Sequence, residues 1–187
     1  SCGRRYSSDA LRREIEALGN VRYLVAPSGL RHSSVGDWHR AYPVAQVHAP
    51  PGLRERRQDI RFGSDLGKVA LAGWSGELDV VVVRGNRITS EAVGFHRPSG
   101  TAIFADLLQQ VPPGWFTGWR GVAARPDLIV ASQPSVPRRF RLAFSDRRAA
   151  RAALRRILAW RAGRVLMGCG EPVTERGDAF LRDAFSW

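Results

Sequence analysis

The sequence predicts an α/β domain, because short segments rich in β-branched residues alternate with amphipathic segments of helical period. The length of 187 residues, of which 44% are hydrophobic and 25% charged, fits one ordinary domain with a substantial core. Three strand-like segments follow one another between residues 78 and 105, with helix-like segments on both sides. We therefore expect a single α/β domain over residues 1–187.

The first element is a predicted helix over residues 8–19. Ser8 can cap its start and Gly19 can end it, while Leu11, Ile15 and Leu18 recur on one face. A short β-prone segment at residues 22–25 follows and ends before Pro27, which cannot continue a central strand. The chain thus begins as a helix followed by a strand.

A loop over residues 27–34 leads into a predicted helix over residues 35–42, which Pro43 ends. Residues 45–49 form a second predicted strand, and residues 50–61 a proline- and arginine-containing loop or short helical turn.

The middle of the chain predicts three consecutive strands over residues 78–83, 91–95 and 101–105. The turn residues Pro98, Ser99 and Gly100 make the second and third of these a hairpin. Asp106 follows the third strand at once, where the chain leaves the sheet and its side chain can enter a cleft.

In the last third of the chain, segments with helical periodicity again alternate with strand-like segments. An aromatic, proline-rich segment at residues 109–126 is expected to pack as a lid or irregular helix, and residues 145–162 predict an amphipathic helix. A strand over residues 164–167 and a helix over residues 178–185 complete the domain.

The chain is strongly basic, with 29 Lys and Arg against 17 Asp and Glu, a formal charge of +12. Every cation except Lys68 is an arginine, a bias that genomic base composition alone can produce. Arginine runs at residues 54–57, 138–141 and 147–156 could track phosphates or form solvated faces. Nucleic acid is therefore a candidate partner, although the sequence contains no recognisable nucleic-acid-binding motif.

Cysteine content and hydropathy bear on the compartment. Cys2 and Cys169 lie at opposite ends of the chain and do not form the disulfide framework of small secreted domains. The sequence has no apolar run near the roughly 18 residues of a membrane span and no signal-peptide pattern. We expect a cytoplasmic protein without a membrane partner.

Candidate functional groups follow three predicted strands: Arg31 and His32 after the first, Asp106 after the hairpin, and Cys169 after the late strand. Loops at one rim of a sheet commonly build sites, because the sheet positions them rigidly. Each residue also has a structural interpretation: His32 can bond to backbone, Asp106 can cap a helix, and Cys169 can fit as a small residue between glycines.

Several short sequence words, taken together, resemble the domain of unknown function numbered 4336, a group similar to the metallo-β-lactamase fold. They are Tyr23-Leu24-Val25-Ala26-Pro27-Ser28, Gly36-Asp37-Trp38, Tyr42-Pro43, Ala49-Pro50-Pro51-Gly52-Leu53, Phe95-His96-Arg97-Pro98-Ser99, Asp106-Leu107-Leu108 and Gly168-Cys169-Gly170-Glu171-Pro172. The resemblance covers residues 9–185 and implies a four-layered αβ/βα sandwich whose strand-end loops form the site.

The resemblance also implies where a metal would bind. Metal-binding members of the superfamily use a Thr-His-x-His-x-Asp-His loop, and here residues 26–32 keep only the last histidine, His32, while Arg31 replaces the loop aspartate. Asp106 takes the place of the bridging aspartate and Cys169 that of a late histidine. Glu91 is the nearest candidate for a further ligand. A two-zinc site is therefore not expected.

Two functions follow from this motif. In the first, the chain is a metal-dependent hydrolase in which His32, Asp106 and Cys169, with Glu91 as an alternative ligand, hold one zinc or iron ion. The ion would activate a water, and Arg31 would orient a small anionic substrate. In the second, the chain binds no metal, Arg31 pairs with Asp106 or Glu91, and the protein binds an anion, nucleic acid or another protein.

The start of the chain departs from the usual order of this fold. Only seven residues precede the first predicted helix, whereas a pair of strands normally comes first. Either the sequence is a fragment of a longer product or the first sheet lacks an edge strand. A sheet without its edge strand exposes apolar surface or unpaired backbone groups, which would favour homo-oligomers.

Overall fold

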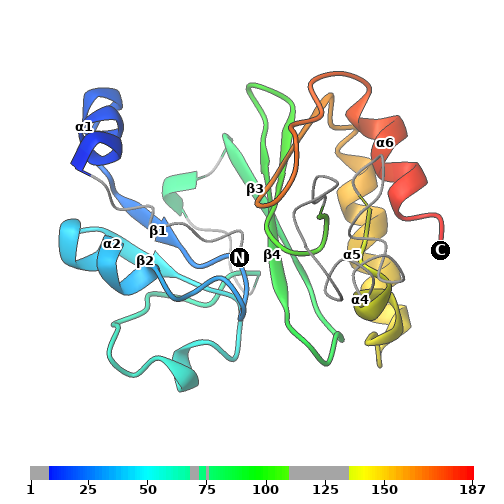
Figure 1. The fold of residues 1–187 in the computed structure, drawn as a ribbon, viewed down its shortest axis with the longest axis horizontal. Helices are drawn as coiled ribbons and strands as arrows, with labels where there is room; N and C mark the ends of the chain where they lie inside the picture. The colour runs from blue at the N-terminus through cyan, green and yellow to red at the C-terminus, as the bar shows by residue number, and fades with distance from the viewer. Residues whose placement is uncertain (1–8, 68–71, 75, 110–134) are drawn as a thin grey trace, which may run out of the picture.

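Two β-sheets lie side by side in the computed structural model, a four-stranded sheet and a two-stranded sheet, with helices on their outer sides (Figure 1). The structure describes residues 9–67, 72–74, 76–109 and 135–187. This arrangement confirms the prediction of an α/β architecture.

The larger sheet contains β3 (Leu78–Val83), β4 (Glu91–His96), β5 (Thr101–Phe104) and β6 (Arg164–Met167), in that spatial order. Neighbours from β3 to β5 are antiparallel, whereas β5 and β6 are parallel. All four strands agree with the sequence prediction to within one residue.

In the described part of the chain, one face of this sheet is covered by the helices α4 (Arg138–Leu142), α5 (Arg147–Ala159) and α6 (Gly177–Ala184) (Figure 1). Inward-facing strand residues such as Val81 and Val93 pack with these helices in one buried cluster. Because successive strand residues point to opposite faces, every second residue of the strand enters this cluster.

Helix α5 forms as its amphipathic pattern predicts. The Asp146 carboxylate caps it by accepting the Ala149 N–H at 2.9 Å, and Leu154 and Ile157 are among its buried residues. The sequence did not predict α4, because its arginine run hides a single buried residue, Phe140.

The other face of the larger sheet is covered only in part. Val80 and Val82 of β3 pack against a second cluster that includes Leu66 and Trp74. Trp74 ends the short 3-10 turn η2 (Ala72–Trp74). On the same face, Ile103 of β5 and Leu166 of β6 are 41% and 43% exposed.

The N-terminal half consists of α1 (Asp9–Leu18), β1 (Tyr23–Val25), α2 (Val35–Ala41), β2 (Gln46–His48) and the turn η1 (Arg54–Arg56). Strands β1 and β2 are parallel and form the smaller sheet. The helices and strands were predicted with ends that differ by one or two residues, and η1 lies within the loop or short helical turn predicted at residues 50–61.

Helix α1 differs from its prediction in one respect. Its apolar stripe predicts a buried face, yet no residue of α1 is buried and Leu18 is 90% exposed.

Backbone contacts join the two halves where β1 ends and β4 begins. The Ala92 N–H donates to the Pro27 carbonyl at 2.8 Å, and Ser28 forms an antiparallel bridge with Glu91. The predicted aromatic segment at residues 109–126 lies, beyond Gln109, outside the described residues.

Within the described part of the chain, no helix has the length and apolar character needed to cross a bilayer.

Candidate functional site

Loops from several strands meet at one edge of the larger sheet. Arg31 follows β1, Glu91 begins β4, Asp106 follows β5 and Cys169 follows β6. Parallel β5 and β6 end at the same edge, and antiparallel β4 begins there. The structure thus brings together Arg31, Asp106 and Cys169, as strand-end convergence predicts.

Asp106 lies at the centre of this edge, with its side chain only 6% exposed. One carboxylate oxygen accepts the Arg31 Nε–H at 2.7 Å, and the other accepts the Ser28 hydroxyl at 2.5 Å. Both oxygens therefore already have a donor. We call Ser28, Arg31, Asp106 and Cys169 the Arg31 network.

Ser28 organises the loop that carries Arg31. Its buried hydroxyl oxygen accepts the backbone N–H groups of Leu30 at 3.2 Å and Arg31 at 3.1 Å, while its proton goes to Asp106. Such a turn around a serine hydroxyl fixes the backbone locally. In the sequence, Ser28 lies within the family-like words, and nothing there indicates this role.

The Arg31 guanidinium lies across the end of β6. Its Nη2 is 2.9 Å from the Cys169 sulfur, and a Cβ on Gly168 would lie 3.1 Å from its Cζ and 2.8 Å from the Ala105 carbonyl oxygen. Glycine at position 168 is therefore what lets the arginine approach. The Arg31 side chain is still 26% exposed, so part of its charge faces solvent.

Glu91 shapes the turn that presents Asp106. It is buried, and its carboxylate accepts the backbone N–H groups of Ala105, Asp106 and Leu107 at 2.7 to 2.8 Å. Burial raises the pKa of Glu91 to about 7, although the N–H donors act in the opposite direction. Glu91 thus fixes the backbone of residues 105–107, a role that its residue type and sequence position did not reveal.

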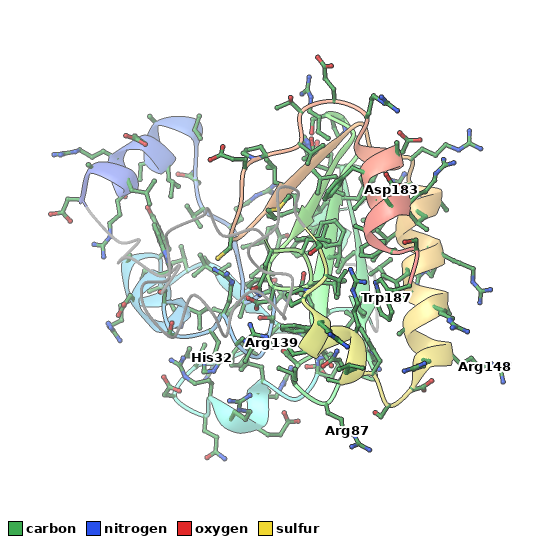
Figure 2. All side chains as sticks on the ribbon, turned by 45° about the vertical axis from the view of Figure 1, so that its right-hand side comes forward. His32, Arg87, Arg139, Arg148, Asp183 and Trp187 are labelled. Carbon is green, nitrogen blue, oxygen red and sulfur yellow. The ribbon has the colours of Figure 1, made fainter. Side chains whose placement is uncertain are left out.

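His32 contacts a different partner. Its Nδ1 is 3.3 Å from Arg57 Nη1, and its carbonyl accepts an Arg57 N–H at 2.8 Å. Burial lowers the pKa of His32, and the charges of Arg56 and Arg57 lower it further. His32 lies in the N-terminal half (Figure 2).

Cys169 is disulfide-bonded, and the described part of the chain contains no free cysteine. A disulfide sulfur carries no thiolate charge, so Cys169 would act as the predicted ligand only after reduction. Its role as a ligand stays a prediction. The sequence contains one other cysteine, Cys2, which precedes the described residues.

The donor set does not fit the single metal ion of the first hypothesis. Asp106 and Glu91 already accept hydrogen bonds on both carboxylate oxygens, Cys169 is oxidised, and His32 contacts arginine. Among the described residues, no three His, Cys, Asp or Glu side chains are grouped to hold a metal ion. Arg31 also places a fixed positive charge beside Asp106.

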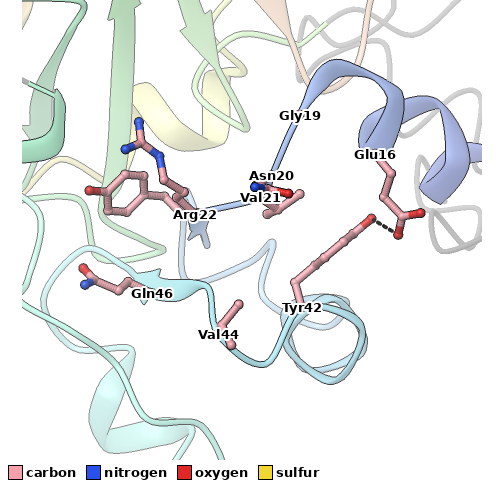
Figure 3. Close-up of a pocket in the computed structure, with 9 residues that line it drawn as sticks. Glu16, Gly19, Asn20, Val21, Arg22, Tyr42, Val44 and Gln46 are labelled. Atoms are coloured by element: carbon pink, nitrogen blue, oxygen red, sulfur yellow. Dashed lines mark hydrogen bonds between the residues drawn. The ribbon is translucent and has the colours of Figure 1, made fainter.

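A cavity of about 710 Å³ opens at the opposite end of the smaller sheet, between α1, β1 and the end of α2 (Figure 3). Its polar groups include Glu16 and Tyr42, whose hydroxyl donates to the Glu16 carboxylate at 3.4 Å. It shares no residue with the Arg31 network.

Comparisons with known proteins support the fold but identify no family and no function. No family model and no curated protein sequence matches the chain, so the resemblance to domain 4336 stays a prediction. A crystal structure of the DIM-1 metallo-β-lactamase exposed to ceftazidime is similar, with a TM-score of 0.59 and 16% sequence identity over 95% of this chain and 72% of that one. The described chain therefore has a metallo-β-lactamase-like fold.

Proposed function

We propose that this chain is a non-catalytic, metal-independent binding protein of metallo-β-lactamase-like fold, in which the Arg31 guanidinium replaces the cation of the metal-binding members. The observation that carries the proposal is the ion pair between Arg31 Nε and Asp106, 2.7 Å long and largely shielded from water. It is the arrangement expected under the second sequence hypothesis.

Electrostatics support this assignment. A unit charge about 4 Å from another of the same sign costs about 4 kcal/mol in the partly screened environment near a protein surface, and a divalent ion about twice that. An ion at Asp106 would also have to displace the Ser28 and Arg31 hydrogen bonds. Arg31 thus stabilises the carboxylate that a metal ion would otherwise neutralise.

The same edge has the charge of an anion site. Arg56 Nη1 donates to the Gly29 carbonyl at 3.4 Å, and Arg57 holds the His32 carbonyl, so two more arginines contact the loop that carries Arg31. The Arg57 guanidinium is already paired with both oxygens of the Asp59 carboxylate, so Arg56 supplies the further charge. Guanidinium groups bind carboxylates and phosphates through paired hydrogen bonds. The proposed ligand is a small anion that binds the exposed side of Arg31.

Metal analysis of untagged protein tests the first part of the proposal. We expect far less than one zinc or iron ion per chain, and no gain in thermal stability when zinc is added. Stoichiometric metal that is lost in both Asp106→Ala and His32→Ala would contradict the proposal and favour the hydrolase.

Phosphate titration tests the second part. Inorganic phosphate should raise the melting temperature of the wild type and of Arg31→Lys, which keeps the charge, but not that of Arg31→Ala. Each variant is compared with its own phosphate-free melting temperature, since Arg31→Ala leaves Asp106 unpaired. Arg148→Ala is the matched control, because Arg148 is an exposed arginine of α5 that points away from the molecule (Figure 2). An equal phosphate effect in Arg31→Ala and wild type would refute the anion site.

A further inference from the structure

A second feature lies on the helical face of the molecule, on the other side of the larger sheet from the N-terminal half. A groove of about 450 Å³ opens between α4, α5 and the segment that follows α6. Its floor is apolar and its rim is basic. The floor includes Phe144, Leu154, Phe185 and Trp187, and the rim is formed by Arg141, Arg147, Arg151 and Arg155. We call it the helical groove.

The rim carries charge of one sign. Arg147, Arg151 and Arg155 recur every four residues along α5, and no acidic residue lines the groove. Like charges at this spacing destabilise a helix slightly, so the stripe is unfavourable for the isolated protein. Within the described ranges, none of the four rim arginines forms a salt bridge. The groove therefore lacks an acidic partner of its own.

The inner end of the groove is preorganised. Trp187 stacks on Phe144 with ring centroids 5.5 Å apart, and the Arg141 guanidinium lies 5.8 Å above the Trp187 ring. Arg141 Nε donates to the Val136 carbonyl at 2.9 Å, which fixes the side chain beside the floor. A bound molecule would meet the stacked rings and the Arg141 guanidinium largely in place, and only a turn of the Trp187 ring would be needed to present its buried Nε1–H to the groove.

One buried donor at this end has no acceptor. Trp187 Nε1 is shielded from solvent and has no hydrogen-bond partner among the described residues. A buried N–H without an acceptor is costly, and such groups call for a specific explanation. An acceptor oxygen on a ligand would satisfy this N–H.

From these observations we infer that the helical groove binds a small amphipathic anion, with one acidic head group and an apolar body. The body covers the floor, and the head group accepts hydrogen bonds from the rim arginines. The volume is within the usual range for small-molecule sites. A polyanion such as nucleic acid would use the rim but would leave the apolar floor uncovered. This inference does not depend on the proposed function, because the groove shares no residue with the Arg31 network.

Calorimetric titration with monomeric dodecanoate, below its micelle concentration, tests the inference. We expect saturable binding of one molecule per chain. Decanoate and octanoate should bind progressively more weakly, by about fourfold for each methylene removed, if the apolar body is buried on the floor. Dodecanol, which lacks the charge, should bind much more weakly than dodecanoate.

Variants distinguish binding in the helical groove from general electrostatic attraction of an anion to a basic protein. Arg151→Ala should weaken dodecanoate binding about tenfold or more, which is the usual effect of losing a charged hydrogen bond. Arg148→Ala removes an equally exposed arginine of the same helix outside the groove and should leave the affinity unchanged. Trp187→Phe keeps an aromatic ring but removes the N–H, and it should weaken binding by a smaller factor. Since the two arginines are exposed, both arginine variants should fold normally.

Any one of three results would overturn the inference. The first is an equal loss of affinity in Arg148→Ala and Arg151→Ala, and the second is an affinity that does not depend on the chain length of the fatty acid. The third is binding to anionic phospholipid vesicles or to an oligonucleotide without binding of monomeric dodecanoate. Arg31→Ala should leave dodecanoate binding intact, so failure of the anion site at Arg31 and failure of the groove can be told apart.

Discussion

The two halves of the molecule differ in how they are stabilised. Among the described residues, the C-terminal half buries 20 hydrophobic residues in one cluster between the larger sheet and its helices, whereas the corresponding N-terminal cluster contains seven. Yet the N-terminal half supplies the loop that carries Ser28 and Arg31. A loop on a small core needs support from elsewhere.

That support comes from polar contacts with the larger half. Ser28 and Arg31 bond to Asp106, and the turn that holds Asp106 is fixed by Glu91. Between the halves, a cavity of about 260 Å³ is lined by apolar residues such as Val25 and Ile103, so packing there is incomplete. The hydrogen bonds of Ser28 and Arg31 to Asp106 are therefore both part of the candidate site and contacts between the two halves.

A matched pair of core substitutions tests the difference between the two cores and should give the largest effect on stability. Leu181→Ala in α6 and Leu53→Ala in the N-terminal cluster remove the same atoms from residues that are 1% and 2% exposed. We expect both to lower the free energy of unfolding within the range of about 2 to 5 kcal/mol, with Leu181→Ala the larger because its cluster is larger. Urea unfolding followed by circular dichroism measures both. A larger loss in Leu53→Ala would contradict the view that the C-terminal core dominates stability.

The junction should give the protein a characteristic pH dependence. Burial raises the pKa of Glu91 from 4.5 to about 7, so the folded state holds a proton that the unfolded state releases. Stability from this group is therefore complete below about pH 4.5 and is lost as the pH rises through about 7, by about 3 kcal/mol. Urea unfolding at about pH 5 and pH 8 tests this, with Glu91→Gln as the variant in which the difference should disappear. Higher stability at pH 8 in the wild type would contradict it.

A smaller effect should follow from Ser28→Ala. The change leaves the Leu30 and Arg31 N–H groups without their acceptor and removes one donor to Asp106. We expect a loss of about 1 to 3 kcal/mol in the free energy of unfolding. Hydrogen exchange should show faster opening of residues 28–32, while protection in α5 falls only as far as global stability does. Unchanged exchange in this loop would show that the hydroxyl does not anchor it.

Local patterns predicted most of the elements, because their period and end signals are properties of short segments. The strand β3 agrees with its β-branched run, and α5 with its apolar stripe and Asp146 cap. Two predictions failed. The sequence did not predict α4, because its only buried residue, Phe140, lies within an arginine run. The apolar stripe of α1 predicts a buried face, but no residue of α1 is buried, because burial depends on which elements pack against the helix.

The sequence predicted only part of the candidate site. The positions of Arg31, Asp106 and Cys169 after strands indicated that they meet, and a pairing of Arg31 with Asp106 was one of two predicted outcomes. The sequence did not indicate the roles of Ser28 and Gly168, since a buried hydroxyl and a missing Cβ matter only when the neighbouring chain is in place. Glu91 looked like a ligand because a sequence does not show three backbone N–H groups from a distant turn.

The sequence by itself determined the α/β class, the strand ends and the charge of the chain, because these depend on composition and on neighbours along the chain. Only the tertiary structure decided which groups lie together: it placed a guanidinium beside Asp106 and Cys169 and aligned four arginines over an apolar floor. The physical reason is that desolvation and Coulomb energy depend on distances between residues far apart in sequence, and packing sets those distances.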